Sequence, residues 1–200
     1  MKAVIFIDVQ NDFLKGGKLA YGYPEKDNFL QIVEFAKACR DEGHMLYATA
    51  DTHNQETYCT TLEGKMLPVE HCIEGTRGHQ LGDGLVKDIN GSVIIPQGHI
   101  IDKNTFGSFD LLARIDQDFV VDSFGRLTNV SKYDGIGEPL DEIVICGYCL
   151  SICVMANAVM LRAKYPNVKI TVKTGLCGDV DKESFDAAVK VLTMQQINVE

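Results

Sequence analysis

The residue types in this chain that could carry out covalent chemistry stand where apolar runs end. Asp8 directly follows one such run, Asp51 follows a second, and Cys153 comes shortly after a third. A cysteine attacks a carbonyl carbon once a base takes its proton or a nearby cation lowers the pKa of its thiol. A positioned carboxylate can serve as that base. The three positions therefore predict nucleophilic catalysis by cysteine, provided that the fold brings them together.

Cys153 stands in a segment typical of a strand that turns sharply into a helix. The apolar residues 143–146 are followed by Gly147, and the helix is expected to begin near Ser151, whose hydroxyl could cap it. Cys153 would then lie in the first helical turn, where free backbone N–H groups and the helix dipole favour a thiolate and could hold an oxyanion. The alternative is an ordinary buried cysteine at a strand–helix junction, because cysteine is among the most buried residue types.

Cys146 and Cys149 form a Cys-x-x-Cys motif, which leaves a second chemistry open. Such motifs occur in zinc sites and in disulfide exchange. A four-sulfur zinc site needs a second cysteine pair, which the sequence does not supply, and a chain of 200 residues does not need disulfides for its stability. A non-catalytic redox or binding protein that uses Cys146 and Cys149 therefore remains as an alternative of another class.

Asp51, His53 and His71 could bind a metal ion. The first and third residues of Asp51-x-His53 project to the same side of an extended segment, and His71 follows a loop. Zinc, iron and manganese all accept one oxygen and two imidazole ligands, and three protein ligands are the minimum for a catalytic metal site. The alternative is that both histidines are ordinary loop residues.

Apolar runs and helical spacing predict the elements that hold these residues. Strands are expected at 4–7, 45–50, 93–95, 143–146, 170–172 and 197–199, and helices at 26–42, 106–115, 152–163 and 181–194. Strands that are apolar throughout and alternate with helices indicate a parallel sheet covered on both faces. We expect one Rossmann-like α/β domain over residues 1–200, with three α/β/α layers around a central, mostly parallel sheet. Functional residues should gather at the carboxyl ends of its strands, with 54–80 looping over them and 116–139 forming a flap or hairpin.

Charge and hydropathy narrow the range of partners. The formal net charge of −9 argues against binding to nucleic acid or to an anionic membrane. No apolar run approaches the about 20 residues of a membrane-spanning helix, and the apolar stretch near the N-terminus is too short for a signal peptide. We therefore expect a cytoplasmic protein that acts on a small molecule and could form a homo-oligomer.

Five segments, in this order along the chain, resemble the isochorismatase-like superfamily of cysteine hydrolases. They are 8–13, 51–53, 63–76, 103–108 and 147–154. Lys103, which alone would be interpreted as a solvated surface charge, gains a role from this resemblance. The resemblance implies that Cys153 attacks a carbonyl, that Asp8 takes and returns the proton, and that Lys103 stabilises the thiolate and holds Asp8. It also implies an oxyanion hole built from the N–H groups of Cys149 and Cys153, and a cis peptide bond before Cys149.

Within that superfamily, the ligand set resembles the one in nicotinamidases. The resemblance implies that Asp51, His53 and His71 bind one divalent transition metal per chain (zinc, iron or manganese), which receives a ring nitrogen of the substrate. The fourth protein ligand varies between branches of the family, and Glu63 is the best candidate in this chain. Glu56 and Glu70 are weaker candidates.

The reaction implied by the resemblance is hydrolysis of nicotinamide to nicotinate and ammonia through a thioester on Cys153, a step of pyridine nucleotide salvage. Nicotinamidases commonly have an aromatic residue shortly before the second histidine, where this chain has the sequence Met-Leu-Pro-Val at 66–69. Phe13 could supply one face of the substrate pocket and Tyr58 or Tyr148 another, and the small-molecule amide could be a different one. The alternative within the superfamily is a metal-independent hydrolase of another small amide, ureido or vinyl ether substrate.

Overall fold

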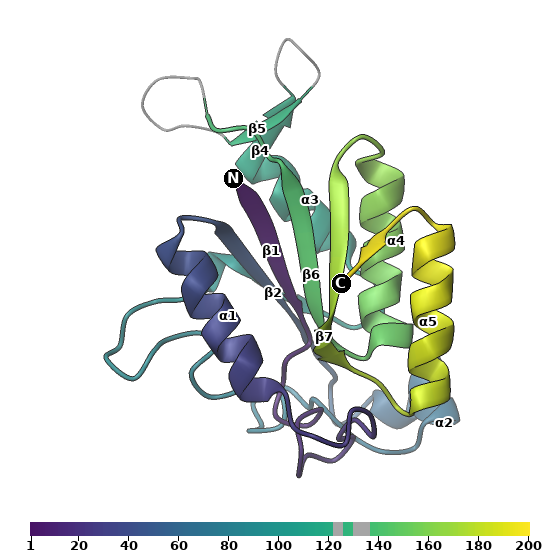
Figure 1. Cartoon of the computed structure of the whole chain (residues 1–200). Helices are drawn as coiled ribbons and strands as arrows, with labels where there is room; N and C mark the ends of the chain where they lie inside the picture. The colour runs from purple at the N-terminus through teal and green to yellow at the C-terminus, as the bar shows by residue number, and fades with distance from the viewer. Residues whose placement is uncertain (122–125, 130–136) are drawn as a thin grey trace.

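A parallel sheet between helices forms the centre of the computed structural model, which describes residues 1–121, 126–129 and 137–200 (Figure 1). Within these residues the strands are hydrogen-bonded in the order β3-β2-β1-β6-β7-β8, and every neighbouring pair is parallel. Their bounds are Lys2–Ile7 (β1), Met45–Asp51 (β2), Ile100–Lys103 (β3), Glu142–Tyr148 (β6), Lys169–Gly178 (β7) and Asn198–Val199 (β8). The predicted α/β class and mostly parallel sheet are confirmed.

Four helices flank the sheet. Their bounds are Phe29–Asp41 (α1), Phe109–Asp118 (α3), Met155–Lys164 (α4) and Lys182–Met194 (α5). Helix α1 lies on one face of the sheet and α3 on the other, while α4 and α5 pack against each other beside β7 and β8 (Figure 1). Helices α3 and α5 begin at side-chain caps, Ser108 and Asp181, which accept backbone N–H groups of the first turn. Among the described residues, no helix is both long and apolar enough to span a membrane.

The central strands are apolar because both of their faces are covered. Residues 4–7 of β1 have no exposed surface, and every residue of β6 is buried. Such strands lack the alternation of polar and apolar residues that marks a half-exposed sheet. Removing this apolar surface from water is the main favourable contribution to folding, and it fixes the strands whose carboxyl ends hold the polar residues.

The third predicted strand is wrong. Residues 93–95 do not join the sheet, and the edge position belongs to β3, several residues later. Ile94 and Ile95 are buried, but their N–H groups donate to the carbonyl of Val86, so this apolar segment folds back on its own chain neighbours. Strand β3 was harder to recognise because an edge strand of four residues, with Asp102 exposed in its middle, has no continuous apolar run.

Two segments lie beyond opposite ends of the sheet (Figure 1). The stretch 54–80 contains a short 3₁₀ turn at Tyr58–Thr60 and the helix α2 (Leu62–Met66), and α2 lies at the end of the molecule where β1 and β2 end. In the predicted flap 116–139, strands β4 (Phe119–Val121) and β5 (Leu127–Asn129) pair antiparallel. Residues 122–125 and 130–136 of that flap lie outside the described residues.

Candidate active site

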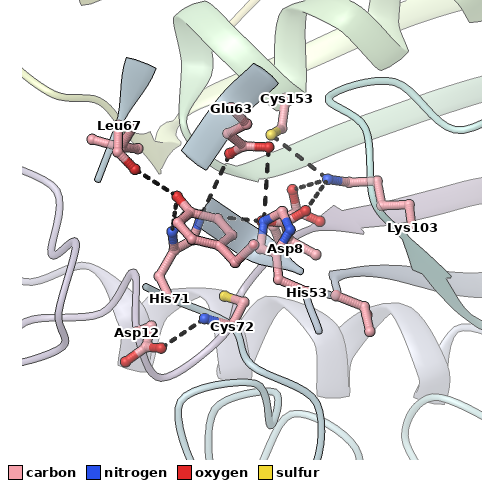
Figure 2. Close-up of polar contacts among 12 residues, drawn as sticks. Asp8, Asp12, His53, Glu63, Leu67, His71, Cys72, Lys103 and Cys153 are labelled. Carbon is pink, nitrogen blue, oxygen red and sulfur yellow. Dashed lines mark hydrogen bonds and ion pairs between the residues drawn. The ribbon is translucent and has the colours of Figure 1, made fainter. Parts of the chain in front are cut away.

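Asp8, Lys103 and Cys153 meet at the carboxyl edge of the sheet (Figure 2). Lys103 Nζ lies 2.7 Å from Asp8 Oδ2 and 3.7 Å from Cys153 Sγ. The side chain of Asp8 is 0% exposed and that of Lys103 is 2% exposed. Thr49 donates its hydroxyl to the second carboxylate oxygen of Asp8 at 2.6 Å. Three residues from distant parts of the sequence thus form one buried cluster in which a thiol, a carboxylate and an ammonium touch.

Burial and neighbouring charges set the protonation of this cluster. Burial raises the pKa of Asp8, and the Lys103 ammonium opposes that effect. Burial alone would lower the pKa of Lys103, but the negative charges around it, first that of Asp8, raise it above its usual value. Burial and then the charge of Asp8 raise the pKa of Cys153 well above its usual range. These surroundings favour a neutral thiol at Cys153 through its raised pKa, whereas a position at a helix start favours a thiolate.

The turn that carries Cys153 has the predicted cis peptide bond but is not capped by the predicted residue. The peptide bond between Tyr148 and Cys149 is cis, as predicted, and Cys153 lies in a π-helical turn, Leu150–Val154, that continues into α4. Ser151 does not cap this helix: its N–H and its hydroxyl both donate to the carboxylate of Asp179. The capping acceptor thus comes from the end of β7, which sequence spacing could not indicate.

Asp51, His53, Glu63 and His71 form a second cluster against the first. Their ligand atoms all lie within 4.8 Å of one another. Asp51 Oδ2 is 2.9 Å from His53 Nε2 and 3.3 Å from His71 Nε2, and each histidine nitrogen lies 3.6–3.8 Å from a Glu63 oxygen. Two imidazoles and two carboxylates match the ligand preferences of zinc, iron and manganese. The predicted candidate Glu63 lies with the other three residues, so this donor set fits a divalent transition metal.

Neighbouring residues orient the imidazole of His71 in the second cluster. His71 Nδ1 lies 2.8 Å from the carbonyl oxygen of Val69, which favours the tautomer that leaves Nε2 free as a ligand. The buried Tyr58 packs edge-on against both His53 and His71, and its hydroxyl donates to the Leu67 carbonyl. Tyr58 was considered only as a pocket residue from the sequence, and the structure places it against the metal ligands.

Gln10 also supports this cluster, although the sequence alone gave it no role. Its amide donates to the carbonyl oxygens of Asp51 and His79 and accepts the N–H of Asp51. Since Gln10 is fully buried, these three hydrogen bonds tie the end of β2 to the segment after β1. Its place within the segment 8–13 was a signal of importance, but its partners depend on tertiary contacts.

The two residues suggested for the substrate pocket have different surroundings. Phe13 lies beside His71, with ring centroids 5.6 Å apart, next to the candidate metal ligands. Tyr148 is fully buried, stacks on Tyr21 and donates its hydroxyl to Asn28. The structure therefore places Phe13 at the cluster, whereas the side chain of Tyr148 belongs to the core and has no exposed surface to offer a ligand.

The Cys-x-x-Cys motif lies at the end of strand β6, where its two cysteines are surrounded by other residues of the fold. Cys146 is fully buried inside β6, and burial raises its pKa well above the usual range. Burial also raises the pKa of the Cys149 thiol, to about 12. All seven cysteines are free thiols in the described structure. Since disulfide exchange requires an accessible thiolate, these surroundings do not favour redox chemistry at the motif.

The sequence of this chain matches a known protein family over almost its whole length. The profile of the isochorismatase domain matches residues 2–199. The chain belongs to the isochorismatase family. Nicotinamidase from Saccharomyces cerevisiae is 25% identical over 187 residues, which cover 80% of each chain. This family membership, together with that relative, makes the chain an isochorismatase-family hydrolase similar to nicotinamidases.

Solved structures show the same fold. The nicotinamidase from Bacillus subtilis has a TM-score of 0.72 at 22% identity, with 99% of this chain and 98% of that chain covered. The pyrazinamidase of Pyrococcus horikoshii, solved in complex with zinc, has a TM-score of 0.70 at 21% identity and covers 100% and 98%. At these identities the likeness shows the shared architecture of an isochorismatase-family protein.

Proposed function

We propose that this chain is a metal-dependent amidase that hydrolyses nicotinamide to nicotinate and ammonia through a thioester on Cys153. The observation that carries the proposal is the contact between the two clusters. Asp51 lies 3.5 Å from Lys103 Nζ through one carboxylate oxygen and 2.9 Å from His53 through the other. Lys103 therefore contacts both the nucleophile and a ligand of the candidate metal site, so the two clusters can act on the same small substrate. The likeness to nicotinamidases supports an amide with a ring nitrogen as that substrate.

The chain's own residues account for each proton and bond. Asp8 accepts the thiol proton as the sulfur of Cys153 attacks the amide carbon. Backbone N–H groups of Cys149 and Cys153 hold the oxyanion that forms. When the C–N bond breaks, Asp8 returns the proton to the departing nitrogen, and ammonia leaves. Asp8 then takes a proton from water as the water oxygen attacks the thioester; the C–S bond breaks, nicotinate leaves, and Cys153 regains its proton.

The remaining residues hold the substrate and Asp8. Lys103 keeps the Asp8 carboxylate in place and offsets negative charge as the sulfur attacks. Asp51, His53, Glu63 and His71 would hold a divalent transition metal, which when bound receives the ring nitrogen and so orients the amide. Phe13, beside His71, supplies an apolar surface for the ring.

A rapid acid quench tests the covalent step. Protein mixed with excess nicotinamide and quenched within one turnover should carry a nicotinoyl group on Cys153, detected by peptide mass spectrometry. Cys153→Ala should carry none and should release no ammonia, while Cys59→Ser, at an exposed cysteine, should behave as wild type. An ammonia-release screen over other small amides serves as the comparison. Stronger turnover of a non-pyridine amide, or an active Cys153→Ala variant, would contradict the proposal.

A further inference from the structure

Asp179 is a buried carboxylate beside the nucleophile turn that the proposed mechanism does not use. It directly follows β7 and is 0% exposed. Its Oδ2 accepts the N–H of Ser151 at 2.8 Å, and its Oδ1 accepts the hydroxyl of Ser151 at 2.7 Å and the N–H of Val180 at 2.8 Å. Ser151 lies midway between Cys149 and Cys153, so these hydrogen bonds hold the centre of the turn.

The backbone of Asp179 is itself fixed by a third segment of the chain. Its N–H donates to the Tyr23 carbonyl at 2.7 Å, and its carbonyl accepts the N–H groups of Gly22 and Tyr23 at 2.9 and 3.0 Å. The two segments are in close contact, because a Cβ at Gly22 would lie 2.1 Å from the carbonyl oxygen of Val180. Asp179 therefore cannot shift unless the segment at 22–23 shifts with it.

The chemistry of the side chain suits this task. The described residues include no lysine, arginine or histidine within salt-bridge distance of Asp179, so its charge is balanced by hydrogen bonds and by the nearby helix start. An ionised carboxylate has enough lone pairs to accept all three donors at once, which an amide or a hydroxyl does not. Charge-assisted bonds of this length are also stronger than neutral ones.

We propose that Asp179 is a positioning residue for Cys153. It touches no reacting atom. Through Ser151 it fixes the turn so that the Cys153 sulfur faces Lys103 and the N–H groups of Cys149 and Cys153 point to one oxyanion position. The inference rests on the proposed function for the identity of the nucleophile, but it does not depend on the metal or on which amide is the substrate.

Four variants test this role by amide turnover, thermal unfolding and alkylation of Cys153, all in a Cys59→Ser background. Asp179→Ala should lower kcat by about 100-fold, the effect of a nucleophile misplaced by about 1 Å, with KM changed less than about twofold. It should also slow labelling of Cys153 by iodoacetamide. Asp179→Asn should have a kcat between those of wild type and Asp179→Ala, because its carbonyl oxygen can still accept the N–H of Ser151 while its amide nitrogen faces the N–H of Val180.

Asp181→Ala is the matched control. Asp181 caps α5 by accepting the N–H of Ser184 at 2.7 Å, so the variant removes an aspartate cap two residues away without touching the nucleophile turn. It should lower the melting temperature modestly and leave kcat unchanged. Ser151→Ala removes only the hydroxyl bond to Asp179 and should lower kcat several-fold, which keeps the test decisive if Asp179→Ala does not fold.

Each outcome has a defined meaning. A kcat of Asp179→Ala within about threefold of wild type, or an unchanged kcat in Ser151→Ala, would overturn the positioning role. An Asp179→Asn variant as inactive as Asp179→Ala would also overturn it, because an amide oxygen that still accepts the N–H of Ser151 would then do nothing to hold the turn. If wild-type protein neither turns over amides nor is labelled at Cys153, the proposed function fails as well. If wild type does both and Asp179→Ala matches it, only the present inference fails.

Discussion

Replacing Lys103 by methionine removes the cation that contacts Asp8 while keeping most of the side-chain volume. The ion pair is 2.7 Å long, with side chains only 2% and 0% exposed. Removing one partner of such a buried pair leaves the other charge without compensation and costs about 3–5 kcal/mol. For a chain of this size we expect the melting temperature to fall by roughly 6–20 °C. Turnover should be lost, because Asp8 is then no longer held as an ionised base.

Denaturant unfolding of three variants measures this effect. Lys65→Met, at an exposed lysine, should stay within about 0.5 kcal/mol of wild type. The double variant Asp8→Asn/Lys103→Met removes both charges, so it should recover a large part of the loss seen in Lys103→Met. If Lys103→Met costs less than about 1 kcal/mol, or if the double variant is no more stable than the single one, the buried pair does not have the energetic role assigned to it.

The same variant should respond to pH in a defined direction. Burial raises the pKa of Asp8, and the opposing effect of Lys103 is absent in Lys103→Met. A carboxyl group whose pKa is higher in the folded than in the unfolded protein binds a proton on folding, so its destabilising effect shrinks as pH falls toward the unfolded pKa of about 3.9. The stability difference between Lys103→Met and wild type should therefore narrow on acidification. A difference that widens instead would contradict this assignment.

Asp8→Asn should abolish amide turnover yet leave the bound metal unchanged by elemental analysis, because Asp8 is assigned to proton transfer. His71→Ala should lose about one metal per chain, and Glu63→Ala should lose less, since water can replace a carboxylate oxygen; equal retention in both would contradict the ligand assignment. Burial alone would raise the pKa of Glu142, but contacts with Lys169, Thr171 and Lys2 lower it to about 2. The stabilisation that follows from this lowered pKa is present above about pH 4.5 and is lost as pH falls toward 2. Glu142→Gln should therefore be less stable than wild type at pH 7 and approach it near pH 2 in denaturant titrations.

Much of the fold and the meeting of Asp8 with Cys153 could be predicted from the strand pattern, whereas Lys103 was placed with them only by the resemblance to the isochorismatase-like hydrolases. The runs that became β1, β2 and β6 are continuous because both sheet faces are covered, and the carboxyl ends of parallel strands share one edge. The apolar pattern did not predict β3, because a short edge strand with an exposed residue has no continuous apolar run to distinguish it from a loop. Residues 93–95 were misassigned because burial under a local turn produces the same apolar run as burial in a sheet.

The supporting residues could not be predicted, because their partners come from distant segments. Asp179 meets Ser151 only because β6 and β7 are neighbours in the sheet, and Tyr58 meets His71 only through the fold of the loop between them. The protonation of Cys153 is a similar case. A helix start favours the thiolate, but burial beside Asp8 raises the pKa instead, and the extent of burial is a property of the folded chain.

The most direct test of the proposed function is ammonia release from nicotinamide as a function of bound metal. Chelated protein should be reloaded with zinc, iron or manganese in steps, with turnover and metal content measured on the same samples and Cys153→Ala as the blank. We predict turnover that rises in proportion to metal, saturates near one ion per chain, and is absent from the blank, while iodoacetamide still labels Cys153 in the chelated protein. Full turnover by metal-free protein would contradict the assignment and make the chain a metal-independent hydrolase of its family.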